Sequence, residues 1–330
     1  MPGIKMLRKI QLGRESIAGT AVAATTVWRG EGVGEDQLSV SFPSENVGIL
    51  GGVNRSIISM LGGQVSISQN ATFEQLLHVL EAGIKTSVPA ADGVGTGKVS
   101  TFTFPTTAVP TLKTYTIEAG DNQQAEKMEY SFVESFSLTG KAGEGLQLEA
   151  VWKGRQWATA TYTAALSLPA VEDILFSKFK LYIDAIGGTI GSTQVSNSLL
   201  SMQLSVKTGL VAVWTADGNK YFSFTKSTAP EVSLQLVFEH DTNSVAQKAN
   251  WRAGTPLLLR LEAQGSSLTT PGTFSYKTLR IDLAGTWEKF AALADENGND
   301  TIAGTFKALY DTTAAKFAEI VVVHNLSAVP

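Results

Sequence analysis

The fold is decided by residues 128–152, whose sequence is MEYSFVESFSLTGKAGEGLQLEAVW. Apolar and polar side chains alternate toward both ends of this stretch, first through Phe136 and Leu138 and then through Leu146 and Leu148. A glycine-rich link, residues 140–145, separates the two alternating runs. Alternation with a period of two on both sides of such a link predicts an antiparallel hairpin with one buried face.

A helix is expected in each half of the chain. The first runs roughly from Thr72 to Ala82, and its apolar residues recur with helical spacing at Phe73, Leu76, Leu77 and Leu80. Thr72 and Gln75 have the spacing of a capping box, and Gly83 predicts the C-terminal end. The second helix is expected from about Asn243 to Ala253, ending at Gly254.

The order of these elements recurs along the sequence. A strand, Val65–Ser68, precedes the first helix, and a strand, Val232–Phe238, precedes the second. Their first valines lie 167 positions apart, which is close to half the chain. A later strand begins at Tyr276, and Asn297-Gly298 in the link that follows it is a strong hairpin signal that parallels residues 128–152. We therefore predict two copies of one β-rich domain, residues 1–168 and 169–330, with the boundary near Pro169.

Two stretches are expected to be long loops, residues 31–63 and 86–112, because glycines and prolines interrupt both. Long loops are uncommon in compact domains and usually functional. We expect these loops to reach neighbouring subunits, and the candidate contact residues are Gly51, Asn54, Arg55, Gly95 and Lys98.

The composition excludes several classes of protein. Charged residues make up 17% of the chain, below the ~25% of ordinary globular proteins, which is typical of a surface that becomes buried in an assembly. The net charge of −4 argues against a permanent nucleic-acid coat, which needs clustered Lys and Arg. The absence of cysteine excludes disulfides and thiolate chemistry. The first residues lack the apolar core of a secretory signal, and no apolar run of ~18 residues predicts a membrane span.

No catalytic or metal-binding pattern stands out. The three histidines, His78, His240 and His324, form no local metal pair. Asp295, Asn297 and Asn299 begin like a calcium loop, but later positions of the loop are wrong, so a hairpin turn is the better interpretation. Residues 93–99 hint at a phosphate loop, yet a strand rather than a helix follows them. We therefore expect no enzyme activity, no cofactor and no metal.

Three segments of the chain carry motifs that resemble those of known proteins. Residues 12–21 have a G-x-E-x-x-x-G-T pattern that is similar to a common opening of phage virion proteins. Residues 50–56 and 62–67, with the helix over Phe73–Leu80, and the hairpin over residues 135–154 form the other two segments. These two resemble the middle and the characteristic hairpin of the siphophage major tail tube protein family. The resemblance covers roughly residues 7–155, and it reaches the second half through the repeat.

This resemblance implies a mainly β fold with a few helices, in which a β-sandwich or open barrel is flanked by a helix. It implies rings of six such domains whose inner sheets join around a DNA channel. Two tail-tube-like domains per chain favour three chains in a pseudo-hexameric ring; a hexamer of chains, with the second domain as decoration, is the alternative. The rings would stack into a tube in the virion, made in the bacterial cytoplasm, with the tape measure protein and DNA as transient partners and no membrane anchor.

Strand carboxylates are the candidates for lining such a channel, where their charge would repel DNA phosphates. They are Glu129, Glu134, Glu149 and Asp282. Two other functions fit the composition. One is a different virion β-protein, a decoration or adhesin module without a channel, and the other is a carbohydrate-binding β-sandwich.

Overall fold

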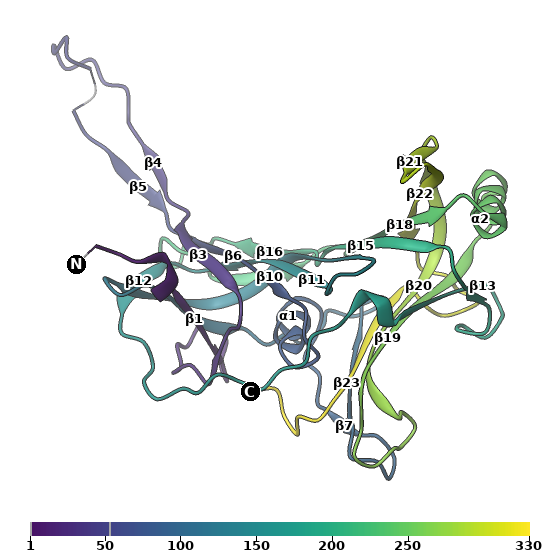
Figure 1. The fold of residues 1–330 in the computed structure, drawn as a ribbon. Helices are drawn as coiled ribbons and strands as arrows, with labels where there is room; N and C mark the ends of the chain where they lie inside the picture. The colour runs from purple at the N-terminus through teal and green to yellow at the C-terminus, as the bar shows by residue number, and fades with distance from the viewer. Residues whose placement is uncertain (1, 53) are drawn as a thin grey trace.

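The computed structural model describes residues 2–52 and 54–330, and strands dominate it (Figure 1). Within these residues there are two α-helices, α1 (Leu76–Gly83) and α2 (Thr242–Ala253), and two short 3₁₀ turns, η1 (Lys5–Leu7) and η2 (Phe176–Lys178). The prediction of a mainly β protein with a few helices is confirmed.

The strands fall into two series along the chain. In the first half they are β1 (Lys9–Arg14), β2 (Thr26–Val27), β3 (Glu31–Asp36), β4 (Ser39–Ser41), β5 (Ile57–Met60), β6 (Gly63–Asn70), β7 (Ala90–Ala91), β8 (Lys98–Thr103), β9 (Tyr115–Gly120), β10 (Ala125–Lys141), β11 (Gln147–Gly154) and β12 (Trp157–Ala160). In the second half they are β13 (Phe179–Ala185), β14 (Gln194–Val195), β15 (Leu199–Lys207), β16 (Leu210–Val213), β17 (Phe224–Ser227), β18 (Glu231–Glu239), β19 (Leu257–Ser267), β20 (Tyr276–Phe290), β21 (Ala294–Glu296), β22 (Asn299–Ala308) and β23 (Ala318–His324).

One long antiparallel sheet runs through both halves of the chain. Its strands follow the order β3-β6-β11-β10-β15-β18-β22-β20, and each pair of neighbours is antiparallel. In Figure 1 this sheet crosses the molecule from β3 at one end to β22 and β20 at the other. The predicted hairpin over residues 128–152 is the β10–β11 pair at its centre, and that prediction is confirmed.

The two longest strands each belong to two sets of partners. The first part of β10 pairs with β9 and β12, and its second part pairs with β11 and β15. The first part of β20 pairs with β19 and β23, and its second part pairs with β22. Each strand therefore leaves the long sheet and continues beneath it, which closes a core between the layers.

The pairing pattern of the first half recurs in the second half in the same chain order. We name the two series the first unit and the second unit. The corresponding elements are β1 and β13, β3 and β15, β6 and β18, α1 and α2, β9 and β19, β10 and β20, β11 and β22, and β12 and β23. The domain boundary near Pro169 stays a prediction, since residues 173 and 175 bridge to the first unit and a single core cluster spans both units.

Bulges give the correspondence a residue-level register. The β10–β11 ladder shifts at Glu134, between Val133 and Ser135. The β20–β22 ladder shifts at Glu288, between Trp287 and Lys289, so the two bulges lie 154 positions apart. A bulge adds one unpaired residue and bends its strand.

The same register shows which residues of β6 and β18 correspond. Val65 lies opposite Trp152, and Leu234 lies opposite Phe306, the residue equivalent to Trp152. Val65 therefore corresponds to Leu234, which lies two residues beyond Val232, the first valine of the second strand. A shift of two keeps the same face of a strand buried, so alternation in the sequence could not detect it.

The helices differ from the expectation at one end. α1 begins at Leu76, four residues later than predicted. The Thr72 hydroxyl accepts a hydrogen bond from the Gln75 N–H, but the Gln75 side chain turns to Val27 and Arg29, so the predicted capping box is wrong. α2 has a capping box at Asp241, and Gly254 ends it in the left-handed conformation with φ 64°, as predicted.

Two histidines are buried in hydrogen-bonded settings. The Nδ1 of His78 lies 3.2 Å from the hydroxyl of Tyr115, which donates to Glu81, and Glu81 also holds Arg14 through two hydrogen bonds. His324 accepts the Leu326 N–H at Nδ1, so its Nε2 carries the proton and donates to Ser100. Burial, aided by Arg14, lowers the pKa of His78 to about 4, and burial, aided by Lys277, lowers the pKa of His324 to about 4.

We predict that the free energy of unfolding falls as the pH drops from about 6.5 toward 4. Between these values the unfolded histidines bind protons that the folded ones exclude, and the stability is fully present above the unfolded pKa. Urea unfolding across this range checks the prediction. His324→Gln should flatten the pH dependence, whereas the matched change at the exposed His240, His240→Gln, should leave it unaltered; equal effects of the two variants would contradict it.

Candidate functional site

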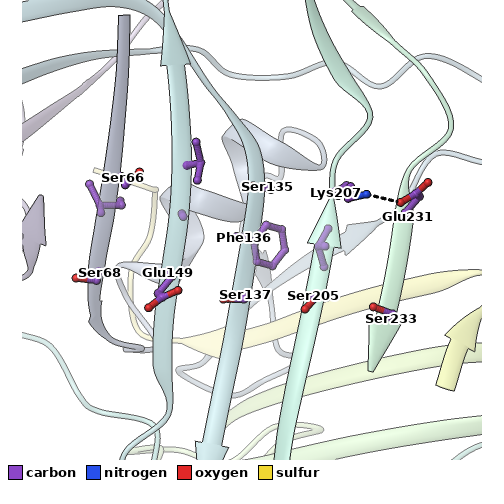
Figure 2. A pocket seen from close by; sticks show the side chains of 14 residues that line it. Ser66, Ser68, Ser135, Phe136, Ser137, Glu149, Ser205, Lys207, Glu231 and Ser233 are labelled. Atoms are coloured by element: carbon purple, nitrogen blue, oxygen red, sulfur yellow. Dashed lines mark hydrogen bonds and ion pairs between the residues drawn. The ribbon is translucent and has the colours of Figure 1, made fainter. Parts of the chain in front are cut away.

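The long sheet has one apolar and one polar face. Phe136, Leu204 and Leu234 are buried in the core. The opposite face presents a band of serines across β6, β10, β15 and β18, which line a shallow groove of about 670 Å³ (Figure 2); they are Ser66, Ser68, Ser135, Ser137, Ser205 and Ser233. Period-two alternation in every strand of the sheet produces this separation.

Charges on the serine face are mostly neutralised in pairs. The Nζ of Lys207 lies 2.9 Å from Oε2 of Glu231, a contact drawn in Figure 2. The Nζ of Lys153 lies 2.5 Å from Oε1 of Glu134. Glu149 is exposed beside the serines, and no salt bridge to it is found among the described residues. A face of hydroxyls and paired charges stays hydrated and offers a polyanion no cluster of cations to bind.

Of the four predicted channel residues, two lie on the serine face. They are Glu134, at the bulge, and Glu149. Glu129 lies in the first part of β10, outside the long sheet, 3.7 Å from Arg155. Asp282 is buried and does not reach the face, since both of its oxygens accept hydrogen bonds of 2.7 Å from Arg260. Alternation alone could not show that Asp282 belongs to the first part of β20, which pairs with β19 and β23 and lies outside the long sheet.

The first predicted loop, residues 31–63, contains β3 and a long hairpin. We name residues 37–62 the arm; β4 and β5 pair within it, and Figure 1 shows it projecting away from the sheet. Gly51, Asn54 and Arg55 are exposed near its tip, where Arg55 pairs with Glu45. Contrary to the expectation, residues 31–63 are therefore not a loop throughout, because β3, β4 and β5 lie within them.

The second predicted loop, residues 86–112, contacts the second unit of the same chain. Lys98 begins β8, which pairs with β23 of the second unit, so Lys98 lies opposite His324. Gly95 packs against the backbone of Gly272 so closely that a Cβ would lie 2.6 Å from the Gly272 nitrogen. The carboxylate of Asp92 accepts hydrogen bonds from the N–H groups of Thr273 and Phe274 and fixes this loop to the second unit.

The two units meet at a hydrogen-bonded ladder between β10 and β15. Residues Ser135–Lys141 pair in antiparallel register with residues Ser201–Lys207. Beside the bulge, the carbonyl of Glu134 accepts the N–H of Thr208. In the order of the long sheet, β10 is the last strand of the first unit and β15 is the first strand of the second, and this ladder joins them.

At each end of the long sheet, no described strand fills the place that its partner fills at the β10–β15 junction. Among the described residues, β6 is the strand that pairs with β3, whose Glu35 carbonyl also accepts the indole N–H of Trp157, and residues 286–290 of β20 pair with β22 alone. On the β20 edge, the carbonyl of Glu288 accepts the indole N–H of Trp251 from α2, at the place where Glu134 accepts Thr208. Sequence reasoning missed β3 as an edge strand, since Gly32 and Gly34 weaken its β pattern.

The two edges differ in charge, because acidic residues are exposed on β3 whereas the edge segment of β20 exposes both Glu288 and Lys289. Glu31, Glu35 and Asp36 are exposed on β3, and no basic residue lies in that strand. Lys289 and Lys307 are exposed beside the edge of β20. Unpaired edges template pairing with another chain, and complementary charge favours one edge over others as the partner.

Compared with models of known protein families and with curated protein sequences, the chain matches none. In residues 2–52 and 54–330 no three acidic or histidine side chains converge to hold a metal ion. Of the helices in this part of the chain, neither is long and apolar enough to cross a membrane.

We predict that Asp282→Asn lowers the free energy of unfolding by about 3 kcal/mol, because it removes the carboxylate that holds Arg260 in a buried, doubly hydrogen-bonded ion pair. Glu231→Gln is the matched control; it breaks an exposed pair with Lys207 and should cause no measurable change. Denaturant unfolding of both variants checks this, and equal stabilities would show that the Asp282 pair is not structural.

Proposed function

We propose that the chain is a structural subunit of a bacteriophage tail tube, in which three copies close a ring of six units. The observation that supports this most directly is the β10–β15 junction. It joins β10 to β15, the strand that corresponds to β3. The chain still carries one free edge of each kind, at β20, which corresponds to β10, and at β3.

Repetition of this junction between chains adds β3 of one copy to β20 of the next. Every added chain again exposes the same two edges, so the assembly ends only when the last edge meets the first. A closed ring removes the unpaired backbone groups that make edge strands prone to aggregation. The resemblance to tail tube proteins supplies the number of units, six, and two units per chain give a trimer.

The register between chains follows from the internal junction. Lys289 corresponds to Ser135 through the bulge positions. Gln37 lies just beyond the β3–β6 ladder and donates its N–H to the carbonyl of Gly62. Gly62 corresponds to Glu231, which is the partner of Lys207 in the β15–β18 ladder. Gln37 therefore corresponds to Lys207. Ser135 and Lys207 are partners in the chain, so Lys289 faces Gln37 of the next copy.

The serine face lines the interior of this ring. The core and α1 lie on the other side of the sheet, which leaves hydroxyls and paired charges facing the channel. Such a wall passes DNA or a tape measure protein without retaining it, because few unpaired cations are present to neutralise phosphates. Rings then stack through unlike top and bottom surfaces, a heterologous contact that propagates as a filament.

Crosslinking tests the ring and its stoichiometry, and the natural absence of cysteine provides a clean background. We predict that Gln37→Cys/Lys289→Cys forms covalent dimers and trimers on oxidation, while either single variant remains monomeric on a denaturing gel. Ser135→Cys/Lys207→Cys reports the same geometry inside the chain and calibrates the reaction.

Two outcomes would contradict parts of the proposal. A ladder that ends at six chains would replace the trimer by the hexamer. Efficient crosslinking of the internal control without any crosslink between chains, together with micrographs that show no rings or tubes, would reject the tail tube function.

A further inference from the structure

The second unit carries a hairpin that packs on the first unit. This hairpin, β16–β17, lies between β15 and β18 and forms a small separate core with β10. Phe222 meets Tyr130 edge-on with ring centroids 5.0 Å apart, and Arg155 donates 3.2 Å hydrogen bonds to the carbonyls of Phe222 and Ser223. Leu210 is 4% exposed in this cluster.

The arm is the same insertion in the first unit. It lies between β3 and β6, the strands that correspond to β15 and β18. Between equivalent ends the arm spans residues 37–62 and the other insertion spans residues 207–231, so their lengths differ by one residue. The pair Val40–Ile58 in the arm corresponds to the pair Leu210–Ser227.

The arm differs from its counterpart in exposing its apolar side chains. Val40 is 44% exposed where the equivalent Leu210 is buried, and Phe42 is 66% exposed. Leu38, Ile57 and Ile58 are also exposed. Adjacent large apolar side chains on one projecting hairpin mark an interaction surface rather than scattered surface residues.

The second unit has a bare groove where the first unit is covered. Lys153 corresponds to Lys307, so the covered Arg155 corresponds to Leu309. Leu309 is 45% and Tyr310 is 50% exposed, and together with Pro230 and Phe317 they line a groove of about 550 Å³. Arg155 binds backbone carbonyls of the hairpin that covers it. At the equivalent position Leu309 offers an apolar side chain, which suits an apolar ligand.

From these equivalences we infer that the arm of one chain packs into the Leu309–Tyr310 groove of the next copy of the chain. This contact rests on the proposed ring, since β3 of one copy must lie beside β20 of the next for the arm to reach the groove. The internal hairpin continues from β15 past the bulge at Glu134 onto Tyr130. The arm follows the equivalent course from β3 past Glu288, with Glu35 and Asp36 at its base close to Lys289 and Lys307.

A second pair of cysteines tests the contact. Phe42→Cys and Leu309→Cys on separate chains, mixed and oxidised, should give a covalent dimer, and the double variant should give covalent trimers. Val94 is 93% exposed on a different loop, so Phe42→Cys mixed with Val94→Cys is the matched control and should give none.

A substitution that places a charge on the arm gives an independent test of the contact. Val40→Asp should weaken association of chains about tenfold in sedimentation, because burial of an apolar side chain is lost. Val94→Asp should have no effect, and both sites are exposed in the single chain, so folding is preserved.

The outcomes separate this inference from the proposed function. If the Gln37–Lys289 crosslink forms and the Phe42–Leu309 crosslink does not, the arm contact is wrong and the ring stands. If neither forms while the Ser135–Lys207 control does, both are wrong. A Phe42 crosslink to Val94 as efficient as that to Leu309 would also overturn the arm contact.

Discussion

The ladder between β10 and β15 is the interaction on which the rest of the structure depends. It adds the edge strand of the second unit to the long central strand of the first, so two units share one sheet and one core. The alternative, two separate sheets, would leave both strands with unpaired N–H and C=O groups. Because the junction uses only one edge of each type, it also determines which two edges remain free.

Bulges and buried charge pairs fix the geometry around that ladder. Glu134 and Glu288 bend β10 and β20 at equivalent points, so each strand can serve the long sheet and the layer beneath it. Where β20 passes into the lower layer, Arg260 and Asp282 are paired in the interior. Such a pair contributes little net stability, but loss of one partner is costly, so it discriminates against other arrangements of these strands.

The two units differ in what their hairpin insertions contact. The β16–β17 hairpin buries Leu210 and Phe222 against its own chain, while the arm presents Val40 and Phe42 to solvent. The surfaces at the equivalent positions also differ, with Arg155 in the first unit and Leu309 in the second. One copy of this contact is buried within the chain and the other is exposed, which is the arrangement that the proposed assembly would require.

The sequence by itself determined the β10–β11 hairpin, both helices and the order of elements that recurs in the two halves, because period-two and helical spacing are local properties of the chain. It also placed Glu149 on an exposed strand face. Only the tertiary structure decided that Asp282 is buried, that residues 98–103 pair with β23, and that β3 and β20 are edges. Strand partners are chosen by contacts between residues far apart in the chain, and a shift of two residues leaves the local pattern unchanged. For the same reason the groove at Leu309 and Tyr310 could be recognised only once the equivalent surface at Arg155 was seen to be covered.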